Sequence, residues 1–147
     1  MKVLVAYDGT LQAKDALRYG VQKVKENGGE VVALHVFNSN QYLDYDVFGA
    51  EELGRVESTR FVEEARRILR EDGGSIRSRV IVEEGNPEEE TMRYAREHNV
   101  DLLLCSPGYK SIVRSFSMLM GEQGTQVSED TVLDEMEKPR LYVVAQR

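Results

Sequence analysis

The sequence predicts a single-domain, doubly wound α/β fold with a five-stranded, mostly parallel sheet. Two observations support this fold class. Short apolar segments alternate along the chain with segments whose apolar residues recur at helical spacing. The 147 residues are also the size of one domain, and 41% of them are hydrophobic. Because alternating strands and helices imply a parallel sheet with right-handed crossovers, we expect residues 1–147 to form one such domain.

The first strand is predicted over Lys2 to Ala6 and ends at the turn residues Asp8-Gly9. A helix follows, and Asn27-Gly28-Gly29 is typical of a helix end. Glu30 to Phe37 is predicted as the second strand, because its nearly continuous apolar run suits a strand covered on both faces. The helix between these strands has an apolar stripe made of Ala13, Ala16, Leu17, Gly20, Val21 and Val24.

A polar and aromatic connection is predicted over Asn38 to Ala50, and a long helix follows to about Glu71. The sequence Asp72-Gly73-Gly74 stops this helix. Ile76 to Val82 alternates between apolar and polar residues, so we expect a third strand close to an edge of the sheet. We expect the aromatic residues of the connection to cover the sheet or a dimer face; they are Tyr42, Tyr45 and Phe48.

The third helix has a clear start, because Asn86 can cap it and Pro87 suits its first position. It ends near His98-Asn99, and Leu102 to Cys105 is predicted as the fourth strand. A helix over about Val127 to Glu137 is predicted to precede the fifth strand, Leu141 to Ala145. Between these segments, apolar residues at helical spacing indicate a short extra helix; they are Ile112, Val113, Phe116, Leu119 and Met120.

The composition argues against several classes of partner. The net charge is −7, and the clustered arginines of residues 60–70 are interleaved with glutamates, so nucleic acid is not expected as a partner. No apolar run approaches the ~18 residues that cross a bilayer, and the start of the chain is too short for a signal-peptide core. The single cysteine excludes an intrachain disulfide and suits a reducing cytoplasm.

One segment has the features of a phosphate-binding turn. Asp101-Leu-Leu-Leu-Cys-Ser-Pro-Gly108 is an apolar strand that runs into a glycine turn, and Gly124-Thr125 follows downstream. Ligands bind at the carboxyl ends of parallel strands in open α/β sheets. Glycine lets backbone N–H groups approach a phosphate closely, and a helix N-terminus favours an anion. The segment therefore indicates a nucleotide site.

Nearly the whole chain resembles the universal stress protein family, and four short stretches carry the resemblance. Each stretch is weakly specific, but their order and spacing together are more so. They are Val3-Leu-Val-Ala-Tyr-Asp-Gly-Thr10, Val32-Ala-Leu-His-Val36, Glu84-Gly-Asn-Pro87 with the following helix and Val100-Asp-Leu-Leu-Leu104, and Pro139-Arg-Leu-Tyr-Val-Val144.

The resemblance implies a dimer with the last strand, Leu141 to Val144, at its interface, and it implies ATP binding, with magnesium, in many members. The family pattern is glycine, two residues, glycine, nine residues, then glycine with serine or threonine. By this resemblance Asp8 would contact the adenosine, and the backbone at Val36 would lie against the adenine. Gly108 and the Gly124-Thr125 pair would hold the ribose and phosphates.

The sequence departs from that pattern. Ser106 and Tyr109 stand at the two glycine positions, and Gly108 lies one residue early. The spacer to Gly124 has fifteen residues, 109 to 123, where the family has nine. Gly121 is a poorer end point because a carboxylate, Glu122, follows it. Lys110 and Arg114 would lie one helical turn apart in the spacer and either face a triphosphate or stay solvated.

Each candidate residue also has a structural interpretation. Asp8 suits a turn that stabilises the helix start, and Gly124 and Thr125 suit a loop and a helix cap. Cys105 is typical of a small buried hydrophobe. His35 and His98 lack metal-ligand spacing. No Ser–His–Asp or Cys–His arrangement can be assembled from the sequence, so no catalytic residues are assigned.

The sequence thus favours a cytoplasmic, dimeric protein similar to universal stress proteins that binds ATP or ADP and acts in stress response or signalling. An alternative is a related interaction module that has lost its nucleotide. Slow ATP hydrolysis is a weaker alternative, because no general base is identifiable. A receiver domain is disfavoured, because the third strand ends in Val82-Glu83-Glu84 where that fold would require an aspartate.

Overall fold

The computed structural model describes residues 1–38, 50–105, 125–130 and 141–146, and the side-chain surroundings of residues 1–38 and 56–105. Its elements, in chain order, are β1 (Lys2–Ala6), α1 (Leu11–Asn27), β2 (Glu30–Phe37), α2 (Ala50–Gly73), β3 (Arg77–Glu84), α3 (Pro87–Glu97), β4 (Leu102–Cys105), β5 (Thr125–Asp130) and β6 (Leu141–Gln146). Several predicted features lie outside the described residues: Gly108, Gly124, the aromatic residues Tyr42, Tyr45 and Phe48, and the extra helix over 112–120.

The strands form one sheet in the order β3-β2-β1-β4-β6-β5. β1 pairs in parallel with β2 and β4, and β2 pairs in parallel with β3. β6 is antiparallel to both β4 and β5. The chain builds outward from β1 to β3 and then returns to the other side of β1, so a topological switch point lies between β1 and β4. The predicted doubly wound, mostly parallel α/β class is confirmed.

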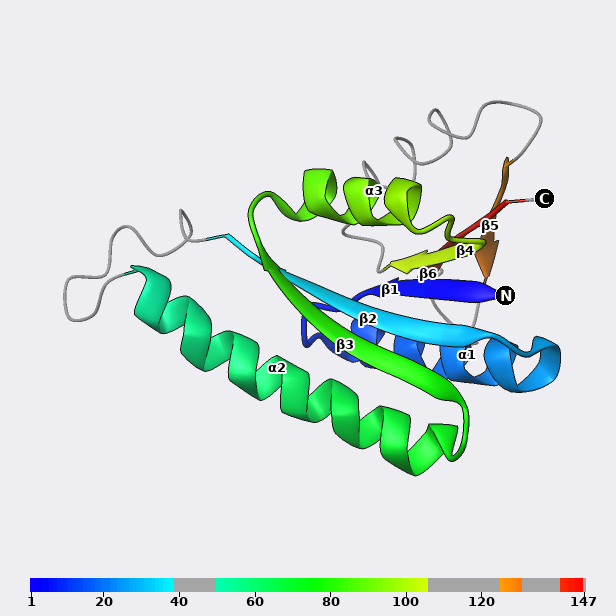
Figure 1. Ribbon diagram of the computed structural model, residues 1–147, viewed down its shortest axis with the longest axis horizontal. Coiled ribbons are helices and arrows are strands. Elements are labelled where there is room, and N and C mark those ends of the chain that lie inside the picture. Colours follow the sequence, from blue (N-terminus) through cyan, green and yellow to red (C-terminus); the bar gives the residue numbers. More distant parts are fainter. Residues whose placement is uncertain (39–49, 106–124, 131–140, 147) are drawn as a thin grey trace.

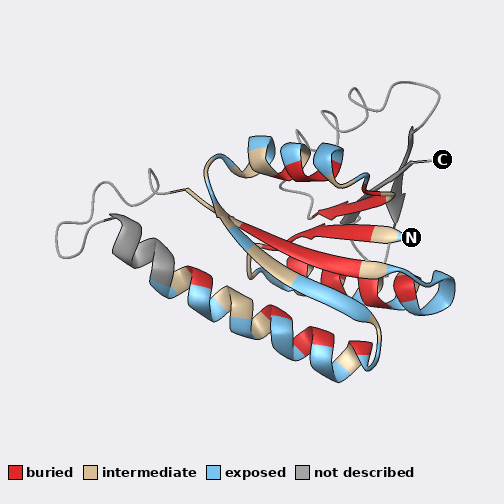
Figure 2. Ribbon diagram, in the orientation of Figure 1, coloured by how far each residue is buried: buried red, intermediate tan, exposed pale blue. Residues whose placement is uncertain are grey.

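Helices cover both faces of the sheet, with α1 and α2 on one face and α3 on the other (Figure 1). Side chains of β1 alternate between the two cores, because successive residues of a strand point to opposite faces. Val3 and Val5 pack with α1 and α2, whereas Leu4 and Ala6 pack with α3. The central strands β1, β2 and β4 are buried almost throughout, as their apolar runs predict (Figure 2).

The predicted helix starts agree with the structure. Asn86 caps α3, where its side-chain oxygen accepts hydrogen bonds from the N–H groups of Glu88 at 3.0 Å and Glu89 at 3.1 Å. Three glutamates then occupy the first turn, where the helix dipole favours negative charge. The predicted edge position of the third strand is also confirmed, because β3 has a partner strand on one side only among the described residues.

The predicted helix over Val127 to Glu137 is wrong for its first residues, and the sheet has a sixth strand. Residues 125–130 form β5, whose register with β6 pairs Thr125 with Gln146 and Asp130 with Leu141. Backbone pairing with β6 supplies hydrogen bonds that a single short helix would otherwise supply, so the tertiary context overrides a weak local preference. As a consequence β6 lies between β4 and β5, and the last strand is not an edge of the described sheet.

Candidate functional site

The candidate site lies at the carboxyl edge of β1, beside the switch point to β4. Asp8 follows the last residue of β1 by two positions, and Val36 follows the partner of that residue, Leu34, by two positions on β2. The N–H of Tyr7 extends the pairing by donating to the carbonyl of Leu34 at 2.9 Å. The structure therefore brings Asp8 and Val36 to the same edge of neighbouring strands.

Asp8 organises the turn that starts α1. Its Oδ1 accepts hydrogen bonds from the backbone N–H of Thr10 at 3.1 Å and from the Thr10 hydroxyl at 2.6 Å. Thr10 in turn caps α1, because its Oγ1 accepts from the N–H of Ala13 at 3.1 Å. Asp8 Oδ2 has no hydrogen-bond partner within the described part of the chain. One oxygen of Asp8 thus stabilises the turn, which is the structural role expected of this residue. The second oxygen remains available to a ligand.

Gly9 lets this turn pass directly over an aromatic ring of α2. Its φ of +79° lies in the region that favours glycine. A Cβ at this position would stand 2.2 Å from Cε1 of Phe61. The ring of Phe61 therefore occupies the space that any side chain at residue 9 would need. The turn can pack this closely against α2 because residue 9 is glycine.

Phe61 belongs to a polar and aromatic cluster beneath the turn. Its ring meets the ring of His35 edge-on at 4.8 Å between centroids and that of Tyr7 at 6.4 Å. The Tyr7 hydroxyl donates to Glu64 Oε2 at 3.2 Å, and Lys14 Nζ lies 3.7 Å from the same oxygen. This Glu64 carboxylate links α1, α2 and the end of β1.

Two titratable groups of the cluster have displaced pKa values. Burial lowers the pKa of His35, whose Nδ1–H donates to the Tyr7 carbonyl at 3.0 Å, so the ring is neutral. Burial and the nearby Glu64 carboxylate raise the pKa of Tyr7 well above its ordinary value, so its hydroxyl keeps its proton. The sequence analysis missed this cluster, although the odd-numbered positions of Tyr7 and His35 on paired strands could have placed both on the α2 face.

The other predicted site residues are placed differently. Val36 is half-buried, and its side chain packs against the core under α3, so only its backbone reaches the edge. Thr125 begins β5, and its register through β6 places it at the amino edge, the same edge as Leu102. The structure therefore does not bring Thr125 together with Asp8. Gly108 and Gly124 lie outside the described residues.

Neither metal chemistry nor a reactive thiol is evident in the described part of the chain. No group of three or more histidine, cysteine, aspartate or glutamate side chains there is arranged to hold a metal ion. Cys105 is buried, and burial raises its pKa to about 12. The thiol is therefore protonated, which agrees with its interpretation as a small core residue.

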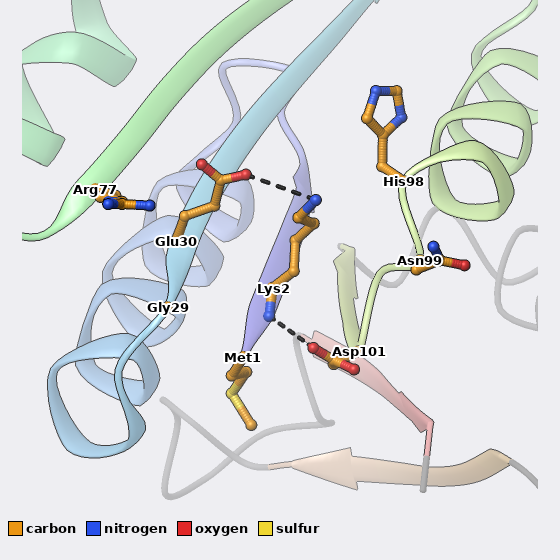
Figure 3. A pocket seen from close by; sticks show the side chains of 8 residues that line it. All are labelled: Met1, Lys2, Gly29, Glu30, Arg77, His98, Asn99 and Asp101. Carbon is orange, nitrogen blue, oxygen red and sulfur yellow. Dashed lines mark hydrogen bonds and ion pairs between the residues drawn. The ribbon is translucent and has the colours of Figure 1, made fainter.

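A separate hollow of about 570 Å³ opens at the amino edge of the sheet. Figure 3 shows Lys2 between two carboxylates there: its backbone N–H donates to Asp101 Oδ2 at 2.8 Å, and its Nζ lies 3.8 Å from Glu30 Oε1. Arg79 binds the same Glu30 oxygen at 3.0 Å. Two cations therefore pair with Glu30, whereas the printed partner of the Asp101 carboxylate is a backbone N–H.

The fold and the turn at the switch point define the class as a Rossmann-like, doubly wound α/β protein. Comparison with known proteins narrows this class. The model of the Universal stress protein family matches residues 1–116 of the sequence. The chain therefore belongs to this family. No curated protein matches the sequence.

Solved structures of similar fold include three universal stress proteins. One from Burkholderia pseudomallei is 21% identical, with a TM-score of 0.63 over 78% of this chain and 86% of that one. One from Archaeoglobus fulgidus, in complex with dAMP, is 18% identical, with a TM-score of 0.60 over 83% and 92% of the two chains. A third, in complex with cAMP, is 16% identical, with a TM-score of 0.55 over 70% and 69%. At these identities the likeness shows the fold.

Proposed function

We propose that this chain binds an adenine nucleotide, ATP or ADP, at the carboxyl edge between β1 and β4, and acts in stress response or signalling through its bound state. The observation that carries the proposal is Asp8, a carboxylate at the switch point with one oxygen committed to the turn and the other unpartnered among the described residues. Ligands of open α/β sheets bind at this position.

Three further points support the proposal. The Asp8 turn is already fixed by Thr10 and by the ring of Phe61, so a ligand would not have to order it. The N-terminus of α1 lies at the same edge and favours an anion. Two family members of similar fold were solved with dAMP and with cAMP.

The proposed contacts are residue-specific. Asp8 Oδ2 would accept from an adenosine hydroxyl or amine, and the backbone of Val36 would lie against the adenine. Gly108 would line the phosphates, with magnesium as the counter-ion of ATP. Thr125, and Gly124 bonded to it, have a weaker claim because β5 begins at the opposite edge of the sheet.

An Asp8→Asn variant tests the proposal. Asparagine keeps an acceptor oxygen for Thr10 and therefore the turn, but replaces the second carboxylate oxygen with an amide nitrogen and removes the charge. We expect ADP and ATP, titrated with magnesium by calorimetry, to bind about tenfold more weakly, a loss near 1.4 kcal/mol, while the thermal midpoint is unchanged. Thr125→Ala is the matched control and should bind like the wild type.

Two results would contradict the proposal. One is an absence of nucleotide binding by the wild type at millimolar concentration. The other is equal affinity of wild type and Asp8→Asn. The first result would favour the second candidate, a nucleotide-free interaction module, which Ser106, Tyr109 and the long spacer support. The second would place the nucleotide away from Asp8. Slow ATP hydrolysis is the weakest candidate. Among the described residues, His35 is the only neutral general base near Asp8, and it is buried.

We also propose that the protein is a cytoplasmic homodimer that uses the segment Leu141–Val144. Among the described residues, no helix is both long enough and apolar enough to cross a membrane. Because β4 and β5 occupy both backbone edges of β6, the partner would contact the face of β6. A Tyr142→Pro substitution should shift the protein to monomer in light scattering, and an unchanged dimer would place the interface elsewhere.

A further inference from the structure

The outer side of β3 combines an unpaired strand edge with a groove along α2. β3 is the last strand on its side of the described sheet, and α2 runs alongside it (Figure 1). Two hollows of about 430 and 440 Å³ lie between the two elements. Arg66 lines both hollows, so they follow one another along a single groove, defined here as the β3–α2 groove.

The backbone groups that face this groove can be identified from the register. Gly85 donates its N–H to the carbonyl of Phe37 on β2 at 2.8 Å. Because alternate residues of a strand direct their N–H and C=O groups to opposite edges, the odd-numbered residues of β3 bond to β2. The outward-facing residues are Ser78, Val80, Val82 and Glu84. They present a ladder of donors and acceptors to an added strand.

The side chains of the groove divide it into two parts with different chemistry. Near the start of β3, Arg66 and Arg70 stand one helical turn apart on α2, and no carboxylate lies within ion-pair distance of either guanidinium in the described part of the chain. Near the end of β3, Val62 of α2 and Val82 line the groove, and Val82 is 42% exposed. Glu63, Glu83 and Glu84 line the same part. One part is therefore basic, and the other combines apolar side chains with carboxylates.

We propose that the β3–α2 groove binds an extended peptide segment of another protein, which adds to β3 as a strand. Main-chain hydrogen bonds to the outward-facing residues supply affinity, and alternate side chains of the peptide point toward α2. One of these side chains is a carboxylate that pairs with Arg66 and Arg70. Another, two or four residues away, is an aliphatic side chain that covers Val62 and Val82. The partner is therefore a β-branched segment with a carboxylate at the end that faces Arg66 and Arg70 and no carboxylate at the end that faces Glu63, Glu83 and Glu84.

The groove proposal does not rest on the nucleotide proposal, because the residues that line the two hollows are not among the proposed nucleotide contacts. A second copy of this chain is a poorer occupant. In antiparallel pairing, Arg77 and Arg79 of one β3 would lie opposite Glu83 and Glu84 of the other. Such a pairing would leave the guanidinium groups of Arg66 and Arg70 on α2 without a carboxylate from the added strand, which the peptide supplies.

Two synthetic peptides probe the groove: acetyl-Thr-Asp-Thr-Val-Thr-Val-Thr-amide and its reversed sequence, acetyl-Thr-Val-Thr-Val-Thr-Asp-Thr-amide. The first suits parallel addition and the second antiparallel addition, so the preferred peptide gives the direction. Each has a control with Lys in place of Asp. Amide chemical shifts of β3 and α2 report binding. We expect one Asp peptide to bind at least about tenfold more tightly than its Lys control.

Variants on both sides of the groove sharpen the test. The double variant Arg66→Glu, Arg70→Glu should reverse the preference toward the Lys peptide. Val82→Pro removes an outward-facing N–H and should abolish binding of both, whereas Val82→Thr keeps that N–H and should bind. All variants are compared with the wild type in thermal unfolding and in nucleotide titration, which the substitutions should leave unchanged.

Three outcomes would overturn the proposal. These are the absence of shift changes along β3 at millimolar peptide, equal affinity for the Asp and Lys peptides, and a wild-type dimer that Val82→Pro dissociates. The last result would assign the groove to a second copy of the chain. If a variant does not fold, the contrast between the Asp and Lys peptides on the wild type still decides the matter.

Discussion

A Gly9→Ala substitution should destabilise the protein more than its single added methyl group suggests. Two separate costs arise. Alanine at a φ of +79° costs ~1–2 kcal/mol relative to glycine. The new Cβ would also stand 2.2 Å from Phe61 Cε1, so the ring would have to retreat by about 1.3 Å to reach ordinary contact at ~3.5 Å.

The retreat of Phe61 has its own cost, because the ring packs edge-on against His35 and Tyr7. Displacing a packed ring costs ~1–3 kcal/mol. Alanine also restricts the unfolded chain more than glycine does, which stabilises the folded protein by ~0.4–1 kcal/mol. The free energy of unfolding should therefore fall by about 2–4 kcal/mol, measured by urea denaturation at neutral pH.

A double-mutant cycle with Phe61→Ala separates the two costs. Removing the ring removes the overlap but leaves the backbone strain, so Gly9→Ala in that background should cost only ~1 kcal/mol. A coupling energy of at least about 1 kcal/mol between the sites is expected. The same cost in both backgrounds would refute the assignment of the clash, and a stabilising Gly9→Ala would refute the geometry of the turn.

Three further predictions concern other residues. Asn86→Ala should lower the free energy of unfolding by ~1 kcal/mol in urea, because the N–H groups of Glu88 and Glu89 lose their acceptor, whereas Asn86→Asp should not. Burial lowers the pKa of His35 below 6.5, so between pH 6.5 and the folded-state pKa the unfolded chain takes up a proton that the folded protein does not. The free energy of unfolding in urea should therefore fall more from pH 8 to pH 5.5 in the wild type than in His35→Gln. An equal fall in both proteins would show that His35 is not responsible. Cys105, with a pKa of about 12, should react with iodoacetamide at pH 8 about a hundredfold more slowly in the native protein than in urea, and equal rates would place the thiol at the surface.

The sequence predicts most of the fold because the buried strands and the helix caps are local signals. β1, β2 and β4 are short apolar runs, and Asn86 and Pro87 indicate the start of α3. β5 could not be predicted in this way. Residues 125–130 contain one valine among polar and acidic residues. Their strand conformation depends on pairing with β6, and a pattern within the segment itself does not reveal that pairing.

The candidate site was predicted only in part for a related reason. Position along a strand brings Asp8 and Val36 to the same edge of the sheet, because β1 and β2 are neighbouring parallel strands with one register. Packing between α2 and the turn is a tertiary contact of Phe61 with Gly9, and no spacing in the sequence encodes it. The partner of Tyr7, Glu64, is likewise 57 residues away in the chain.

The two edges of the sheet differ in electrostatics, and this difference decides where an anionic ligand belongs. The C-termini of α1, α2 and α3 point to the amino edge, where the helix dipoles disfavour negative charge and where Glu30 and Asp101 already stand. Lys2 and Arg79 pair with Glu30, and a bound phosphate would compete with this carboxylate for the same cations. At the carboxyl edge the N-terminus of α1 favours an anion, and Asp8 adds one acceptor for a neutral group. The hollow at the amino edge is therefore the poorer nucleotide site despite its volume.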